Sequence, residues 1–167
     1  MPLYHFEHAI QLSATQKAAI ARAITNWHAT TFKAPQFIVN CRFIDVSQGP
    51  FADNYIGGAP RRINSLSVSL RSGAGRSQEQ LQGMADTLTG IWNDVVGQGS
   101  IEQQLRAMYI MGNVDSAKEA GFHLPLPGKF GQWVKDNADE FRRLAKAGDP
   151  DAIQVVEEME SRPEFRD

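Results

Sequence analysis

The feature that most constrains this chain is an internal repeat with a period of 64 residues. Ser13 and Ser77 are separated by this distance, and each serine can cap a helix that begins at the next residue. Apolar residues then recur at spacings of three and four, which is typical of a helix with one buried face. Because strand-like segments flank both helices, the pattern predicts a duplicated β-α-β unit.

The first unit is expected over about residues 2–46 and the second over about residues 64–111. Together they predict an α+β fold, with a four-stranded sheet and two helices on one face. The predicted strands are residues 2–8, 37–46, 66–70 and 105–111, and the predicted helices are residues 14–31 and 78–96. Residues 47–64 are rich in glycine and proline, which favours a loop with a short edge hairpin around residues 54–56. The other face of this sheet would be bare, so we expect another subunit to cover it.

Charge divides the chain into a body, residues 2–128, and a C-terminal extension, residues 129–167. The extension holds 17 of the 36 charged side chains. Its pattern predicts two helices, at residues 132–147 and 150–160, the second capped by Asp149 and begun by Pro150. The sparsely charged body is typical of a subunit that buries part of its surface in an oligomer.

Composition excludes several classes of protein. The net charge is −2, so no strong field is available to hold nucleic acid. No apolar run is long enough to span a membrane. The single cysteine, Cys41, cannot form an internal disulfide, which favours a cytoplasmic location. Histidine and cysteine do not recur at metal-ligand spacing, so we expect neither a metal nor another cofactor.

Pro2 is the first candidate catalytic residue. If Met1 is removed after synthesis, Pro2 becomes an amino-terminal secondary amine on a strand that would hold it inside the fold. Burial beside positive charge lowers the pKa of such an amine, so that it can act as a base at neutral pH. If Met1 is retained, the Pro2 nitrogen is an amide and can do neither acid–base nor nucleophilic chemistry.

Four further residues could join Pro2. Arg71 and Arg76 flank a glycine-containing loop between a strand and a helix start, an arrangement suited to a carboxylate. His28 lies at the margin of the first apolar stripe, and Glu119 precedes the proline-rich segment 123–128. Each also has a purely structural interpretation, as solvated surface charge or, for His28, as an ordinary hydrogen-bonding side chain.

Taken together, these residues resemble the tautomerase superfamily, and most closely its cis-3-chloroacrylate dehalogenase-like branch. The resemblance covers about residues 2–133. It is carried by Pro2 at the start of a strand, by Lys17 and by five short motifs: Ala-Ile-Thr25 leading to His28, Phe37-Ile-Val-Asn40, Tyr55-Ile-Gly-Gly58, Gly75-Arg-Ser77 and Leu124-Pro-Leu-Pro-Gly128. It implies a homotrimer in which Pro2 is the catalytic amine.

By position, the resemblance implies that His28 contacts the substrate, that Arg71 and Arg76 hold its carboxylate, and that Glu119 activates water. Two departures matter. The two arginines of the family are three residues apart, whereas Arg71 and Arg76 are five apart. The tyrosine that accompanies the water-activating acid in the family aligns with Ile110. Tyr109 therefore replaces it only if the strand register slips by one residue.

We therefore expect a tautomerase that acts on a small keto, enol or unsaturated acid. One alternative is a hydratase or dehalogenase of 3-haloacrylate-like acids in which Glu119 activates water. The other is a trimeric binding module without catalytic activity.

Overall fold

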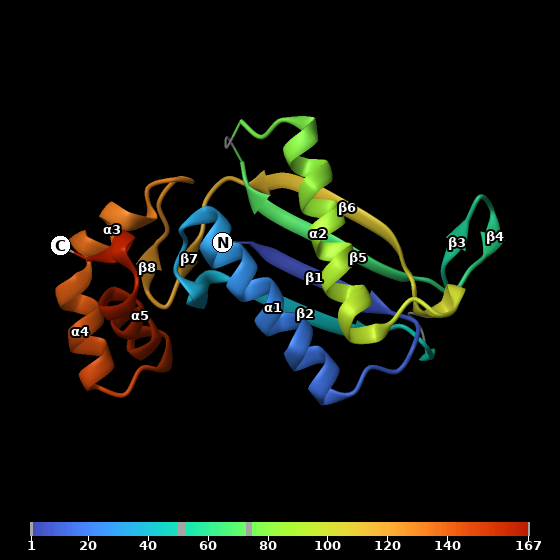
Figure 1. Ribbon diagram of the computed structural model, residues 1–167, viewed down its shortest axis with the longest axis horizontal. Helices are drawn as coiled ribbons and strands as arrows, with labels where there is room; N and C mark the ends of the chain where they lie inside the picture. Colours follow the sequence, from blue (N-terminus) through green and yellow to red (C-terminus); the bar gives the residue numbers. More distant parts are fainter. Residues whose placement is uncertain (1, 50–52, 73–74, 167) are drawn as a thin grey trace.

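A four-stranded mixed sheet forms the body of the protein in the computed structural model, which describes residues 2–49, 53–72 and 75–166 (Figure 1). Met1, residues 50–52 of the predicted loop and residues 73–74 between the two arginines lie outside the described residues, as does residue 167. The strands lie in the order β2-β1-β5-β6. Their bounds are Leu3–His8 for β1, Asn40–Asp45 for β2, Asn64–Arg71 for β5 and Leu105–Val114 for β6.

The strand directions follow from the two β-α-β units. β1 is parallel to β2, and β5 is parallel to β6, as a helical crossover requires. The two units meet antiparallel at β1 and β5, where Tyr4 lies opposite Val68. The predicted α+β fold and the duplicated β-α-β unit are confirmed.

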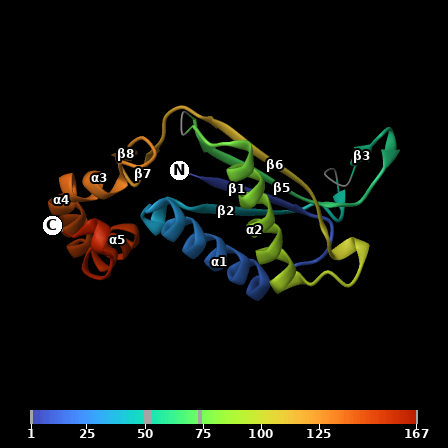
Figure 2. The same ribbon diagram turned by 45° about the horizontal axis from the view of Figure 1, so that its top comes forward.

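Two helices of equal length cover one face of the sheet (Figures 1 and 2). They are α1, Ala14–Phe32, and α2, Gln78–Val96. Each begins with a capping box, in which the serine hydroxyl accepts from the backbone N–H three residues on and the glutamine there accepts from the serine N–H. The cap residues are Ser13 with Gln16 and Ser77 with Gln80, again 64 residues apart.

The main hydrophobic core lies between these helices and the sheet. Alternate residues of β1 and β5 face it, among them Tyr4, Phe6, Leu66 and Val68, all almost completely buried. The intervening side chains, such as Ser67, face the opposite side of the sheet and are only half-buried. One face of the sheet is thus left without a covering layer in the part of the chain that the structure describes.

The predicted strand at residues 37–46 is wrong in its first part. Gln36–Ile38 forms a short 3-10 helix, η1, and β2 begins only at Asn40. Pro35 precedes this turn, and the Gln36 N–H donates to the Glu158 carboxylate at 2.9 Å instead of to a neighbouring strand. The apolar side chain of Ile38 is buried, as its type suggests, but in a second core outside the sheet.

The second core joins the C-terminal extension to one end of the body. The extension contains α3, Phe130–Asp136, α4, Ala138–Lys146, α5, Pro150–Ser161, and the short η4, Pro163–Phe165. Its buried residues pack with Ala34, Ile38 and Leu124 of the body. The single predicted helix at residues 132–147 is therefore two helices. They separate at Asn137, where ψ is 8° and the side-chain amide donates to the Trp133 carbonyl at 2.8 Å.

Two small hairpins and a short turn complete the described fold. β3, Tyr55–Ile56, and β4, Ala59–Pro60, form the predicted hairpin, which extends beyond the far end of the sheet (Figure 1). β7, Lys118–Glu119, pairs with β8, Phe122–His123, beside the extension. A 3-10 turn, η3, Ile101–Gln103, precedes β6. No helix among the described residues is long and apolar enough to cross a membrane.

Candidate active site

Pro2 lies buried at the start of β1, at the end of the sheet nearest the C-terminal extension. The Pro2 carbonyl accepts a hydrogen bond from the Asn40 N–H at 3.2 Å, which extends the β1–β2 pairing to this residue. Pro2 lines a cavity of about 180 Å³. The other residues that line it are His28, Phe32, Ile38, Leu70, Arg71, Arg76, Pro127, Gly128 and Phe130. Four of the six predicted site residues therefore meet in one cavity.

His28 is held in this cavity by a buried hydrogen bond. The hydroxyl oxygen of Tyr4 lies 2.7 Å from His28 Nδ1. Burial lowers the pKa of His28 to about 3 and raises the pKa of the Tyr4 phenol well above its usual range, so both groups are neutral at neutral pH. With the phenol donating to Nδ1, the imidazole carries its proton on Nε2, and that N–H can serve a bound molecule as a donor.

Arg71 and Arg76 bring two positive charges to the cavity. Arg71 ends β5, and its guanidinium donates to the carbonyls of Asp115 and, at 3.5 Å, Leu124. Its buried Nε has no hydrogen-bond partner among the described residues. Arg76 precedes the cap of α2 and donates to the Arg71 carbonyl at 3.3 Å, while its guanidinium lies 5.9 Å from the centre of the Phe32 ring.

Neither guanidinium forms a salt bridge with a carboxylate in the described part of the chain. Partial burial lowers the pKa of Arg76, but an arginine stays charged at neutral pH. Two cations without a counter-ion in a partly buried cavity favour an anion, and paired guanidinium groups suit the two oxygens of a carboxylate.

Glu119 lies close to Pro2 but does not line the cavity. Its carboxylate Oε1 accepts from the Asn40 side-chain amide at 3.3 Å, and the same asparagine bonds the Pro2 carbonyl through its backbone. Burial raises the pKa of Glu119 to about 7. A carboxyl with this pKa can both accept and donate a proton near neutral pH.

Tyr109 is not brought to the cavity within one chain. It lies opposite Ser67 in the β5–β6 register, on the uncovered face of the sheet, and its side chain is 60% exposed. Ile110 lies opposite Val68 and contacts the core on the helical face. The register slip that would turn Tyr109 toward the helices does not occur. The arrangement within one chain therefore gives no support to the predicted catalytic role of Tyr109.

Among the residues at the site that sequence reasoning missed are Tyr4, which bonds His28, and Phe130, which lines the cavity. Tyr4 could have been found, because strand alternation places it on the same face as Pro2. Phe130 could not, because it lies on the extension and reaches the cavity only through tertiary packing. Among the described residues, no three His, Cys, Asp or Glu side chains lie together in a way that could hold a metal ion.

The chain matches a known family over most of its length. The family described as "Putative oxalocrotonate tautomerase enzyme" matches residues 1–138. Among curated proteins, none matches the sequence significantly.

Solved structures resemble the fold at low sequence identity. N1, a member of the cis-3-chloroacrylic acid dehalogenase family, is 20% identical, with a TM-score of 0.61 over 79% of this chain and 90% of its own. A probable enzyme from the thermophilic fungus Aspergillus fumigatus is 23% identical, with a TM-score of 0.60 over 82% and 94%. A fused 4-OT, described as a symmetric trimer, is 17% identical, with a TM-score of 0.53 over 72% and 94%.

Proposed function

Because the chain belongs to the oxalocrotonate tautomerase family, we propose that it is an enzyme that tautomerises a small carboxylate-bearing keto or enol acid. In this proposal Pro2 becomes the amino terminus after Met1 is removed, and its secondary amine is the acid–base group. One observation carries the proposal: Pro2, His28, Arg71 and Arg76 line the same cavity. We also propose that the protein is cytoplasmic.

Substrate binding depends on the two arginines. Arg71 and Arg76 would bind the carboxylate and neutralise its charge. Their positive field and the burial of Pro2 both disfavour a protonated amine, so the proline nitrogen would have a lowered pKa and act as a base. Binding of the carboxylate would also hold the reacting carbon, the one next to the carbonyl, in the small space beside Pro2.

Proton transfer then needs an acceptor and a group that stabilises the enolate. The Pro2 nitrogen would take a proton from the carbon next to the carbonyl, and the C–H electron pair would form the C=C bond of the enolate. The neutral His28 would donate from Nε2 to the enolate oxygen, which carries the developing charge. The protonated Pro2 would return the proton to that oxygen to give the enol, and the reverse sequence converts enol to keto acid.

The Pro2→Ala variant tests this mechanism. Alanine keeps a small residue after Met1 but removes the rigid secondary amine. We expect kcat/KM for the ketonisation of phenylpyruvate enol to fall by about 10²–10⁴-fold, the range for loss of a general acid–base group. Full activity in this variant, or an intact mass that still includes Met1 in the wild type, would overturn the proposal. Retained Met1 would instead favour a binding module without catalytic activity.

Hydration or dehalogenation of an unsaturated acid is a second candidate, favoured by the pKa of Glu119 and its link to Pro2 through Asn40. In that reaction protonated Pro2 would be the acid, and Glu119 would activate water. Glu119→Gln separates the two functions. It should abolish the addition of water to 3-chloroacrylate while tautomerisation continues.

We propose that the functional unit is a homotrimer. The uncovered sheet face and the fused 4-OT, whose description is a symmetric trimer, support this. Sedimentation velocity gives the test: a species with three times the chain mass is expected. A monomer at micromolar concentration would overturn the proposal.

A further inference from the structure

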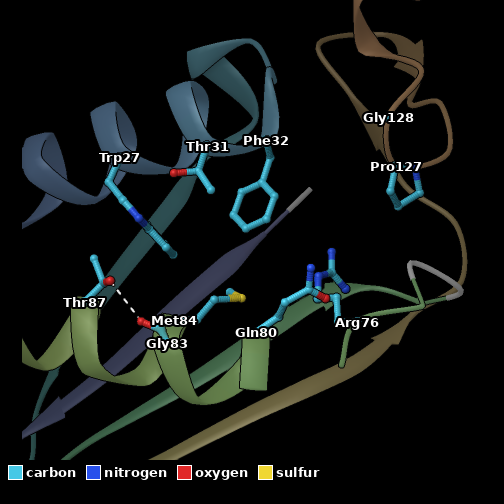
Figure 3. Close-up of a pocket in the computed structure, with 10 residues that line it drawn as sticks. All are labelled: Trp27, Thr31, Phe32, Arg76, Gln80, Gly83, Met84, Thr87, Pro127 and Gly128. Atoms are coloured by element: carbon cyan, nitrogen blue, oxygen red, sulfur yellow. Dashed lines mark hydrogen bonds between the residues drawn. The ribbon is translucent and has the colours of Figure 1, made fainter. Parts of the chain in front are cut away.

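A second and larger cavity adjoins the one that Pro2 lines. Its volume is about 510 Å³, and it lies between the C-terminal half of α1 and the N-terminal half of α2 (Figure 3). Nothing in the proposed proton transfer uses this space. Its lining residues are Trp27, Thr31, Phe32, Arg76, Gln80, Gly83, Met84, Thr87, Pro127 and Gly128.

The walls of this larger cavity are mainly apolar. Trp27, Phe32 and Met84 contribute aromatic and thioether surface from the two helices, and Figure 3 shows these side chains directed into the space between them. The Thr87 hydroxyl is already bonded to the Gly83 carbonyl at 2.9 Å. A molecule that entered would therefore meet chiefly apolar groups, and among the described residues that line the wall only Arg76 is charged.

The two cavities meet at a shared boundary. Phe32, Arg76, Pro127 and Gly128 line both of them. Arg76 therefore lies where one molecule could place its carboxylate near Pro2 and continue into the larger space. The smaller cavity, at about 180 Å³, is below the usual range of about 300–1,000 Å³ for ligand pockets, whereas the larger falls within it.

From this geometry we infer that the substrate is a carboxylate with an extended apolar tail, and that the cleft between α1 and α2 binds this tail. The inference rests on the proposed function for the position of the carboxylate. The substrates are then medium-chain 2-oxo acids rather than three-carbon acids. The reacting head would occupy the space beside Pro2, and Arg76 would mark the junction between head and tail.

Binding of saturated straight-chain carboxylates tests the inference without any catalysis. Butanoate, hexanoate and octanoate can be titrated into the wild-type protein by calorimetry. We expect the affinity to increase about fourfold for each added methylene, the factor that corresponds to about 0.8 kcal/mol per buried CH₂. An affinity that is flat or falls with chain length would overturn the inference. Octylamine has the same tail with the opposite charge and should bind more weakly than octanoate.

Gly83 offers a way to fill the cleft without disturbing the fold. It is helical, and a Cβ placed on it would meet no atom within 4 Å. In Gly83→Leu the new side chain would occupy the tail site, and the change from glycine favours the helix. We expect the dissociation constant of octanoate to rise to within about twofold of that of butanoate, since the buried methylenes lose their contacts.

Gly90→Leu is the matched control. Gly90 lies two turns further along α2, a Cβ there also meets no atom within 4 Å, and the residue does not line the cleft. This variant should keep the full dependence on chain length. Equal losses in both variants would overturn the inference, and thermal melts of both verify that each is folded.

The two proposals fail separately. If affinity rises with chain length but Pro2→Ala keeps full activity, the tail site is supported and the proline mechanism is wrong. If Pro2→Ala loses activity but affinity does not depend on chain length, the mechanism is supported and the tail site is wrong.

Discussion

The two β-α-β units share one backbone plan but use equivalent positions for different purposes. Tyr4 and His28 of the first unit correspond, 64 residues later, to Val68 and Trp92 of the second. The first pair makes a buried polar hydrogen bond at the candidate site, whereas Val68 and Trp92 are completely buried core residues. Trp92 directs its one N–H to the Gln103 carbonyl at 2.7 Å. A duplicated fold can thus keep one copy for packing while the other holds the polar groups of a site.

The largest expected effect tests the packing role of the second unit. Trp92→Ala should lower the free energy of unfolding by about 3–5 kcal/mol, because it leaves a large cavity in the core and an unpaired Gln103 carbonyl. Chemical denaturation measures this loss. Trp92→Phe, which keeps most of the buried volume, should lose clearly less. A small loss in Trp92→Ala would show that Trp92 does not have the packing role assigned to it here.

The corresponding change in the first unit should have a smaller effect on stability, and a second substitution should partly restore the lost stability. His28→Leu leaves the buried Tyr4 hydroxyl without a partner, at a cost of about 1–3 kcal/mol. Adding Tyr4→Phe removes that unpaired group, so the double variant should recover most of the loss in denaturation experiments. Additive losses would indicate that the Tyr4–His28 hydrogen bond is not formed in solution.

The two units should also differ in their response to pH. His28 stays neutral in the folded protein down to a pKa of about 3, whereas in the unfolded chain it binds a proton near pH 6.5. The unfolded state therefore binds more protons between these values, and the free energy of unfolding falls as the pH is lowered, by at most about 1.4 kcal/mol per pH unit. Trp92 has no such group.

The His28→Leu variant isolates this contribution. The difference in unfolding free energy between wild type and variant should shrink or reverse as the pH falls from about 6.5 toward 4. Glu119, whose raised pKa favours the folded state more at low pH, is present in both proteins and drops out of the difference. A difference that does not change with pH would mean that His28 titrates normally.

The smallest expected effect tests how similar the two units are at the starts of their helices. Ser13→Ala and Ser77→Ala each remove one member of a capping box, so each should cost about 1 kcal/mol. Because the two caps have the same geometry, the two losses measured by thermal melts should agree closely. A clear inequality would show that the tertiary environments of the two helix starts differ more than their hydrogen bonds do.

Sequence periodicity predicted the repeated body well because its signals are local. The serine caps and the spacing of Ile20, Ile24, Met84 and Leu88 depend only on neighbouring residues. Only the family resemblance predicted that four residues would meet at one site, because their meeting requires contacts across the whole sheet. These residues are Pro2, His28, Arg71 and Arg76. Tyr109 shows the limit of such an alignment, since a shift of one residue moves a strand side chain to the other face.

The extension was the least predictable part. Its pattern predicted two charged helices, but it also carries the apolar residues of a second core, including Phe130 and Phe141. The break at Asn137 has no glycine or proline to mark it. Nothing in residues 129–167 indicated that Phe130 would line the candidate site.

Arg162 has a consequence for the order in which the protein is made. Its guanidinium donates to the carbonyls of Ala29, at 2.9 Å, and Ala34, at 2.8 Å, at the end of the helix that holds His28, across 133 and 128 residues of sequence. These carbonyls cannot gain that partner until Arg162 has been translated. The helix end beside the candidate site is therefore completed only after Arg162 has left the ribosome, although the helix itself is translated more than a hundred residues earlier.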